Sequence, residues 1–303
     1  MNILKDEIFA EFCGVVGSDH VKIDEPMKHH TTFHIGGPAE YYICPHTVGE
    51  LQEILHICRQ NEISYFILGN GSNLLVSDKG YRGAIIHIYR NMSNIRVDDN
   101  VLTVQAGALF SRVSKKAMEY GLTGLEFASG IPGTTGGSVV MNAGAYGGEI
   151  RDVLREVVVL DQEGDIRCIK ASDLQMGYRT SIIKEAGYIV LEAVLDLQPG
   201  DRGVISGRME ELKKERVAKQ PLEYPSAGST FKRPEGYFAG KLIMDAGLKG
   251  FRVGGAQISE KHCGFVINVD DATAENVLEL IRQVQEKVKL NSGIELELEL
   301  KVV

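Results

Sequence analysis

The sequence predicts a mixed α+β protein of about two domains. Its 303 residues exceed the usual size of one domain, which is roughly 150 residues. Apolar residues recur at helical spacing in some segments, whereas other segments are the short apolar or alternating runs that are typical of strands. Hydrophobic residues make up 44% and charged residues 24% of the chain, as in an ordinary globular protein with a sizeable core.

Each expected element follows from its local pattern. Helices are expected within residues 1–25 and over residues 49–61, 109–120, 207–219 and 272–290. Strands are expected over residues 41–44, 63–68, 84–88, 101–105, 153–160, 166–169, 188–197 and 294–302. Residues 153–169 are expected to form a hairpin across the turn at 161–164.

Three segments near the C-terminal end have the clearest patterns. Residues 272–290 predict a helix that Gly293 ends; the residues of its apolar face are Val277, Leu280, Ile281, Val284 and Val288. The tail 294–302 alternates strictly, which predicts a strand with one charged face. The run 207–219 interleaves Arg, Glu and Lys and predicts a solvated helix, with the main domain boundary beside it near 199–203.

Charge, hydropathy and cysteine usage exclude several classes of protein. The net charge of −8 argues against a nucleic acid as the main partner. No run of about 18 apolar residues occurs, and an N-terminus that carries Asp6 and Glu7 does not resemble a signal peptide. The five cysteines are odd in number and include no C-x-x-C pair, and this spacing argues against a zinc site. We therefore expect a cytoplasmic protein with reduced thiols, no metal and no membrane partner.

The first of two glycine-rich segments is Gly69-Asn-Gly-Ser-Asn-Leu74, directly after an expected strand. Small residues at this place let backbone N–H groups approach phosphate oxygens, so the segment favours a diphosphate-binding loop. It is not the Rossmann fingerprint, because Leu74 stands where a third glycine belongs and no helical pattern follows. A plain Asn-Gly turn is an equally good interpretation of this segment alone.

The second segment runs from residue 130 to residue 148 and contains Gly130-Ile-Pro-Gly-Thr-Thr-Gly-Gly-Ser138. So many glycines predict neither a stable helix nor the interior of a flat strand. Apolar residues within it, such as Val139 and Met141, argue against disorder. Because long loops without secondary structure are usually functional or disordered, the two segments together indicate a large cofactor held by backbone groups.

Three further places could carry chemistry, and each also has an ordinary structural interpretation. Arg179, in Gly177-Tyr-Arg-Thr-Ser181, offers a planar fork of donors for a carboxylate or an enolate, although a surface arginine is the commoner case. Ser229 is expected in a tight turn and could donate a proton, although serine is also a common turn former. The tail glutamates share one face, and chemistry alone does not choose among them; they are Glu295, Glu297 and Glu299.

Taken together, these segments resemble the family of UDP-N-acetylenolpyruvoylglucosamine reductases. The resemblance covers nearly the whole chain and rests on seven segments in order: His30-Thr-Thr-Phe-His-Ile-Gly-Gly-Pro-Ala39, Leu68-Gly-Asn-Gly-Ser-Asn-Leu74, Gly130-Ile-Pro-Gly-Thr-Thr-Gly-Gly137, Asn142-Ala-Gly-Ala-Tyr-Gly147, Gly177-Tyr-Arg179, Ala227-Gly-Ser-Thr-Phe231 and Gly254-Gly-Ala-Gln-Ile-Ser259. Seven segments in one order are far more specific than any one of them.

The resemblance implies an α+β fold of the vanillyl-alcohol-oxidase type. It implies two FAD-binding lobes over residues 1–95 and 96–204, followed by a smaller substrate-binding domain over residues 205–303. FAD would bind without a covalent link, and NADPH would supply the hydride. The residues expected to bind the cofactor are Gly69, Asn70, Gly71, Ser72, Asn73, Leu74, Ile131, Pro132, Gly133, Thr134, Thr135, Gly136, Gly137, Ser138, Asn142, Ala143, Gly144 and Ala145.

The same resemblance implies the roles of the catalytic side chains. The family's arginine corresponds to Arg179, which would stabilise the enolate-like state, and its proton-donating serine corresponds to Ser229. The family's glutamate corresponds to Glu299, although the repeated Glu-Leu leaves a two-residue slip to Glu297 open.

The substrate implied by the resemblance is UDP-N-acetylglucosamine enolpyruvate, bound by a monomeric enzyme. The residues expected to contact it are Tyr178, Lys219, Lys232 and Arg233. About 18 residues separate Arg179 from the end of the next strand at Leu197, which is too few for the inserted loop of the longer family type, so we expect the shorter type. Two rival interpretations are a flavin oxidase of the same fold and a non-catalytic protein that binds a nucleotide or a UDP-sugar.

Overall fold

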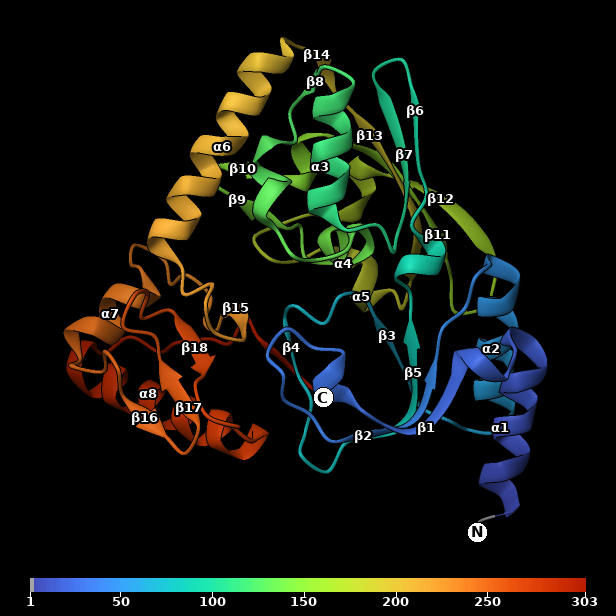
Figure 1. Cartoon of the computed structure of the whole chain (residues 1–303), viewed down its shortest axis with the longest axis horizontal. Helices are drawn as coiled ribbons and strands as arrows, with labels where there is room; N and C mark the ends of the chain where they lie inside the picture. The colour runs from blue at the N-terminus through green and yellow to red at the C-terminus, as the bar shows by residue number, and fades with distance from the viewer. Residues whose placement is uncertain (1–2) are drawn as a thin grey trace. The chain divides into compact units, whose positions relative to one another are not determined.

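The computed structural model describes residues 3–303 as two compact units, each with its own hydrophobic core (Figure 1). The first unit comprises residues up to Ile23, Tyr41–Asn70 and Gly83–Arg216. The second comprises Asp24–Glu40, Gly71–Arg82 and Val217–Val303. The units therefore interleave along the chain, and two short N-terminal segments belong to the C-terminal unit.

The first unit contains the helices α1 to α5 and most of α6. Their bounds are α1 Ile3–Val16, α2 Val48–Gln60, α3 Phe110–Glu119, α4 Thr135–Val140, α5 Ile182–Glu185 and α6 Arg202–Lys219. The strands of a four-stranded sheet, in the order β1-β2-β5-β3, are β1 Val21–Pro26, β2 Pro38–Ile43, β5 Tyr81–His87 and β3 Tyr65–Leu68. Strands β3 and β5 are parallel, and the first glycine-rich segment begins where β3 ends. The first glycine-rich segment therefore begins at the carboxyl end of strand β3, as the sequence predicted.

A five-stranded antiparallel sheet forms the rest of this unit, in the order β12-β11-β13-β7-β6. Its strands are β6 Ile95–Asp98, β7 Val101–Gln105, β11 Leu154–Leu160, β12 Ile166–Lys170 and β13 Ile189–Asp196. Figure 1 shows α3 and α4, in green, beside this sheet. Fully buried residues such as Val157, Ala193 and Leu195 line its core face, and each buried valine or leucine contributes about 1.5–3 kcal/mol. Short strands complete the unit: β8 Leu122–Thr123 pairs with β14 Gln198–Pro199, and β9 Gly144–Ala145 with β10 Gly148–Glu149.

The second unit is a four-stranded antiparallel sheet packed with two helices. Its strands, in the order β15-β18-β17-β16, are β15 Ser226–Ser229, β18 Phe265–Asn268, β17 Ala256–Ile258 and β16 Arg252–Val253. The helices are α7 Ala239–Asp245 and α8 Ala274–Ser292. The tail strand β19 Lys301–Val302 pairs in parallel with β4 Leu74–Leu75, which directly follows the first glycine-rich segment.

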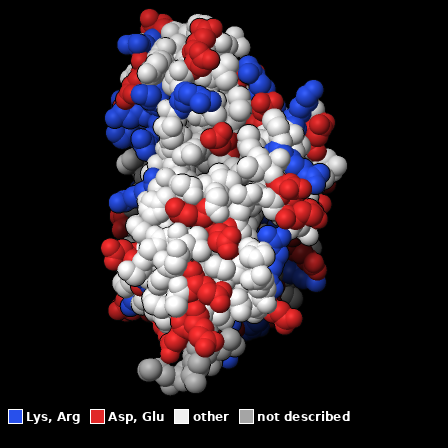
Figure 2. Space-filling view, turned by 90° about the vertical axis from the view of Figure 1, so that its right-hand side faces the viewer, with Lys and Arg blue, Asp and Glu red and all other residues white. Residues whose placement is uncertain are grey.

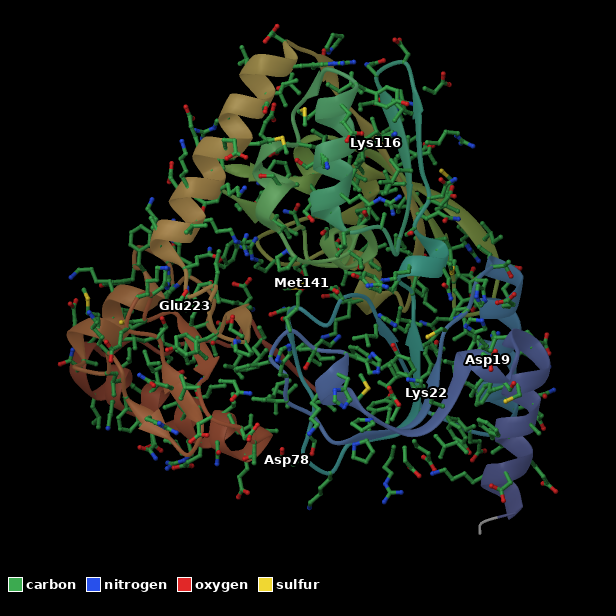
Figure 3. All side chains as sticks on the ribbon, in the orientation of Figure 1. Asp19, Lys22, Asp78, Lys116, Met141 and Glu223 are labelled. Carbon is green, nitrogen blue, oxygen red and sulfur yellow. The ribbon has the colours of Figure 1, made fainter. Side chains whose placement is uncertain are left out.

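Helix α8 confirms the prediction for residues 272–290. Thr273 caps its N-terminus by accepting a hydrogen bond from Asn276 N, and Gly293 ends it with a φ of 73°. The five predicted apolar residues are all buried in the core of the second unit. Asp78, labelled in Figure 3, lies beside the first turn, because its carboxylate accepts from Ala274 N at 2.8 Å and Glu275 N at 2.9 Å. The segment 71–82 is thereby joined to the helix.

The prediction of a helix-free second glycine-rich segment is wrong, because residues 135–140 form α4. Thr134 caps this helix and accepts from Gly137 N at 3.5 Å. A Cβ at Gly136 would lie 2.9 Å from Ala106 Cβ, so the missing side chain allows the helix to pack closely on its neighbour. Tertiary packing and a cap therefore override the poor helix propensity of the two glycines.

The tail prediction is right in its alternation and wrong in its regularity. Leu296 and Leu300 are buried, whereas Glu295 and Glu297 are exposed. Ladder pairing, however, is limited to a bridge at Leu298 and to β19, so most of residues 294–300 are extended without being a strand. The alternation needs only one buried face, whereas a regular strand also needs a partner along its whole length.

The boundary expected at 204/205 lies inside α6, whereas the change of unit falls between Arg216 and Val217. The division into 1–95, 96–204 and 205–303 stays a prediction. On the face drawn in Figure 2, acidic and basic side chains are mixed, and acidic ones follow the lower half, in keeping with the net charge of −8. Within residues 3–303, no helix combines the length and apolar character needed to cross a membrane.

Candidate active site

The two glycine-rich segments meet in the first unit. Asn70 Nδ2 donates a hydrogen bond to Pro132 O at 2.7 Å. A Cβ on Gly69 would lie 2.3 Å from Thr134 Oγ1, so only glycine fits there without a shift of its neighbour. The contact brings together two segments that are more than sixty residues apart in the sequence, as the prediction of one large ligand requires.

Helix α4 lies within the second segment and is followed directly by Met141, which is labelled in Figure 3. Thr135 Oγ1 donates to Ala108 O at 3.0 Å, and Gly136 N donates to Ala106 O at 2.8 Å. Ser138 Oγ is buried and has no hydrogen-bond partner among the described residues. A buried hydroxyl in that state is typical of a site completed by a polar ligand or water, so this residue fits the predicted contact with a cofactor.

Arg179 occupies a strained two-residue turn. Gly177 and Thr180 bridge each other across the turn, and Arg179 has a left-handed φ of 57°. Its guanidinium donates to Gly144 O at 3.2 Å and lies 5.2 Å from the ring centre of the exposed Tyr178. Backbone strain of this kind is concentrated at functional sites. The turn therefore holds a half-buried cation against the second glycine-rich segment.

Ser229 lies at the end of strand β15 and not in a tight turn, which corrects the sequence prediction. The register between β15 and β18 shifts between Ser226 and Ser229, and Gly228, inside the shift, has a φ of 77°. Such a bulge redirects the following side chain, and bulges are common beside active sites. Ser229 is half-buried opposite Phe265. The proton donor predicted from the sequence is thus placed by a strand irregularity that only glycine allows cheaply.

Glu299 is fixed beside the serine strand by its backbone. Its N–H donates to Thr230 O at 2.9 Å, and its carbonyl accepts from Asn73 Nδ2 at 3.1 Å. One residue of the first glycine-rich segment, the residue after Ser229 and Glu299 therefore lie in direct contact. The second unit thus collects two of the three predicted catalytic residues beside residues predicted to bind FAD.

The other tail glutamates point to surface cations. Glu297 accepts from Lys232 Nζ at 3.0 Å, with 73% of its side chain exposed. Glu295 pairs with Lys289, and the hydrogen bond from that lysine lowers the pKa of the carboxyl below its ordinary value. Glu299 is the least exposed of the three glutamates; it is half-buried, and its neighbours Leu298 and Leu300 are half-buried and buried.

The predicted substrate cations lie in the second unit. Lys219 is the last residue of α6, and the guanidinium of Arg233 stacks 4.0 Å from the ring centre of Phe238. Lys232 is held beside the tail by its bond to Glu297 and by its own N–H, which donates to Glu297 O at 2.8 Å. Arg233 and the exposed ring of Phe238 thus form a stacked pair of a cation and an aromatic ring.

The units divide the remaining predicted site residues. Gly69, Asn70, residues 131–138, residues 142–145, Tyr178 and Arg179 belong to the first unit. Gly71, Ser72, Asn73, Leu74, Lys219, Ser229, Lys232, Arg233 and Glu299 belong to the second. Within residues 3–303, no cluster of three or more His, Cys, Asp or Glu side chains could hold a metal ion.

Two residues with a place near the site were missed from the sequence. Thr32 Oγ1 donates to Ser226 O at 2.7 Å, and Thr32 N donates to Gly71 O at 3.2 Å, so this residue links the first segment to β15. Arg216 lies against Gly130, and burial lowers the pKa of its guanidinium. The charged run around Arg216 had predicted a solvated helix face; a single desolvated member of such a run leaves no local signal.

Comparisons with known proteins show the family of this chain. The FAD binding domain matches residues 39–169, and the C-terminal domain of UDP-N-acetylenolpyruvoylglucosamine reductase matches residues 220–303. The UDP-N-acetylenolpyruvoylglucosamine reductase of Alkaliphilus metalliredigens is 49% identical over 99% of this chain and 98% of the relative. The crystal structure of the corresponding enzyme from Thermus caldophilus superposes with a TM-score of 0.80 at 39% identity, covering 93% of this chain and 97% of that one.

A more distant structure shows the fold alone. The 4-ethylphenol oxidase of Gulosibacter chungangensis is 12% identical, with a TM-score of 0.52 over 98% of this chain and 65% of that one. The fold and the two glycine-rich segments thus define an FAD-dependent oxidoreductase. The chain belongs to the UDP-N-acetylenolpyruvoylglucosamine reductase family. The fold class and the family inferred from the sequence are confirmed.

Proposed function

We propose that this chain reduces UDP-N-acetylglucosamine enolpyruvate to UDP-N-acetylmuramate with NADPH, as a step in peptidoglycan precursor synthesis. The observation that carries the proposal is the pair of hydrogen bonds that fix the backbone of Glu299: its N–H donates to the carbonyl of Thr230, the residue after Ser229, and its carbonyl accepts from Asn73 Nδ2. An acid–base pair held against a cofactor segment suits proton delivery to a substrate carbon. A protein that only bound a nucleotide would have no use for that arrangement.

Bound FAD supplies the hydride chemistry, with NADPH as its source. The segments 69–74, 131–138 and 143–145 would hold it without a covalent bond; Ser138 Oγ, buried without a protein partner, is the clearest group left for it among the described residues. The close packing of Gly69 on Thr134 and of Gly136 on Ala106 fixes the two segments in the first unit.

The protein's own groups have three roles in the proposed reaction. Arg179 stabilises the negative charge that develops on the substrate carboxylate, since a preorganised cation lowers the barrier most where charge develops. Glu299 assists in that stabilisation. Ser229 donates a proton to the carbon next to the carboxylate and so completes the lactyl ether.

The substrate's diphosphate would be bound by Lys219, Lys232 and Arg233, with Tyr178 against the substrate. Residues between Arg179 and Leu197 are taken up by α5 and β13, which supports assignment to the shorter family type. A cytoplasmic location, a monomeric state and small molecules as the only partners belong to the same proposal.

An anaerobic absorbance experiment tests the proposal. Flavin bands should bleach with NADPH and return when the enolpyruvyl sugar nucleotide is added. Bands that return with oxygen and ignore the sugar nucleotide would instead identify a flavin oxidase of the same fold. Absence of flavin after reconstitution with FAD would refute the role of both glycine-rich segments.

Replacing the proton donor separates the two half-reactions. Ser229→Ala should leave flavin reduction by NADPH intact and slow the return of the bands on the order of 10²–10⁴-fold. Ser292→Ala is the matched control, because it removes a serine hydroxyl of the same unit that donates to Val288 O and accepts from Ile294 N at the end of α8. Equal losses in both half-reactions would remove the proton-donor role of Ser229.

A further inference from the structure

Asn142 is a fully buried polar residue in the second glycine-rich segment. Its Nδ2 donates to Glu149 Oε2 at 3.0 Å and to Gly177 O at 2.9 Å, and its Oδ1 accepts from Arg151 N at 3.3 Å. Both amide hydrogens are therefore used by the protein. The side chain is committed to internal contacts, although the sequence had suggested a contact with FAD.

One of those contacts fixes the base of the arginine turn. Gly177 N donates to Thr180 O at 3.0 Å, which leaves Tyr178 and Arg179 as the two residues at its tip. The Asn142 amide holds the carbonyl of Gly177 on the other side. The orientation of the turn is thus set by a side chain thirty-five residues earlier in the chain.

A second contact fixes the tip of the same turn. The guanidinium of Arg179 donates to Gly144 O, two residues after Asn142. Base and tip are therefore bound to one short segment, residues 142–144, and the strained φ of Arg179 is held from both ends. Ser181, two residues after Arg179, donates from its Oγ to the carbonyl of Val140, the last residue of α4, at 2.8 Å.

We propose that Asn142 is a positioning residue that sets the orientation of Arg179 toward the substrate carboxylate. The proposal rests on the function proposed above and adds a role that acts through another side chain. Asparagine suits this place for two reasons. It tolerates the left-handed backbone, with a φ of 43°, and it carries two donors that face a carbonyl and a carboxylate.

Two substitutions separate positioning from cofactor binding. Asn142→Gly keeps the backbone conformation and removes the amide, so FAD content and the rate of flavin reduction by NADPH should stay as in the wild type. Reoxidation by the enolpyruvyl sugar nucleotide should slow on the order of 10²-fold, as expected when a catalytic group is misplaced by about 1 Å. Asn100→Ala is the matched control, because it removes an asparagine donor to a carbonyl, that of Leu197, elsewhere in the same unit.

A second variant answers the case in which Asn142→Gly does not fold. In the double variant Asn142→Asp with Glu149→Gln, the amide introduced by the second substitution donates to the carboxylate introduced by the first, which restores the hydrogen bond between positions 142 and 149 in the reverse direction. The donor to Gly177 O stays lost. Slow reoxidation in this variant, with normal flavin reduction, supports positioning through Gly177.

A cycle with Arg179→Ala completes the test. If Asn142 acts through Arg179, Asn142→Gly slows reoxidation in the wild-type background and has no further effect in the Arg179→Ala background. Loss of FAD affinity in Asn142→Gly, or an equal slowing in both backgrounds, overturns the proposal. If Arg179→Ala slows reoxidation and Asn142→Gly does not, the positioning role of Asn142 is refuted and the proposed function is not. If Arg179→Ala has no effect on reoxidation, the role of Arg179 in the proposed function is refuted as well.

Discussion

Substituting Gly69 by alanine should damage the contact between the two glycine-rich segments. The new Cβ would lie 2.3 Å from Thr134 Oγ1 and 3.2 Å from Thr134 Cγ2, far inside van der Waals contact. Overpacking of this kind typically costs about 1–3 kcal/mol. Displacing Thr134 also weakens the cap of α4, which costs roughly 1 kcal/mol. We therefore expect a loss of about 2–4 kcal/mol in the free energy of unfolding.

The same displacement should weaken the binding of FAD. A loss of 1.4 kcal/mol in binding corresponds to a tenfold change in Kd, so titration of apoprotein with FAD should show an increase on the order of tenfold or more. Urea unfolding and flavin fluorescence measure the two effects separately.

A double-mutant cycle tests whether Thr134 is the cause. Thr134→Ala alone should cost about 1 kcal/mol, and Gly69→Ala should cost much less in that background because the clashing hydroxyl is gone. Gly14→Ala, on an open face of α1, is a control of opposite sign and should stabilise by about 0.5–1 kcal/mol. If Gly69→Ala left both stability and FAD affinity unchanged, or if its cost were the same with and without the Thr134 hydroxyl, the packing argument would be wrong.

Two further predictions concern the second unit. Asp78→Ala removes an acceptor that two N–H groups of the first turn of α8 share, and it should lower the free energy of unfolding, measured in urea, by about 1 kcal/mol. Asp78→Asn keeps one oxygen and should cost less. Equal stability of the wild type and both variants would contradict this prediction. Burial lowers the pKa of His262 below its ordinary value of 6.5. As the pH falls, the unfolded state therefore takes up the proton before the folded state does. The stability that the neutral ring contributes to the folded state is complete above about pH 6.5 and is lost as the pH falls below that value. Urea unfolding from about pH 7.5 to about pH 5.5 should therefore show a steeper decline for the wild type than for His262→Gln, and parallel declines would refute the assignment.

The sequence predicts elements well where the signal is local. Helix α8 needs only the spacing of its apolar residues, a cap at Thr273 and a stop at Gly293, and all three are within the segment itself. Helix α4 was missed because its glycines reduce the local helix propensity. The contact that favours glycine at position 136 is its packing on Ala106, which lies thirty residues earlier in the sequence. The interleaved units were missed for the same reason, since contacts such as that of Thr32 with Ser226 join residues 194 positions apart.

The candidate site divides along the same line. Arg179 and Ser229 were chosen through the resemblance of their segments to the family, because each residue alone also has an ordinary structural interpretation. The bulge at Gly228 and the internal use of the Asn142 amide depend on partners in other strands and turns. The sequence therefore indicates candidate side chains, and only long-range contacts explain how these are held.

The structure distinguishes the surroundings of Glu299 and Glu297, between which the repeated Glu-Leu sequence left the catalytic prediction open. Glu297 is largely exposed and paired with Lys232, and an exposed ion pair contributes only about 0–1 kcal/mol. Glu299 is half-buried, and both its N–H and its carbonyl are fixed, one to the residue after Ser229 and the other to Asn73. The backbone of Glu299 is thus anchored next to the residue that follows Ser229, which favours Glu299 as the predicted catalytic glutamate.

Glu299→Gln should therefore slow reoxidation by the enolpyruvyl sugar nucleotide on the order of 10²-fold or more, while flavin reduction by NADPH stays normal. Glu297→Gln is the matched comparison: it makes the same change two residues away and removes the ion pair with Lys232, so it can change the KM for the sugar nucleotide but should leave the rate of reoxidation at saturating substrate normal. The reverse pattern, a slow Glu297→Gln and a normal Glu299→Gln, would shift the catalytic register by two residues. Because the side chains alternate along this extended tail, a two-residue shift keeps the same face, so burial and backbone anchoring, rather than the face of the chain, must decide which carboxylate reaches the substrate.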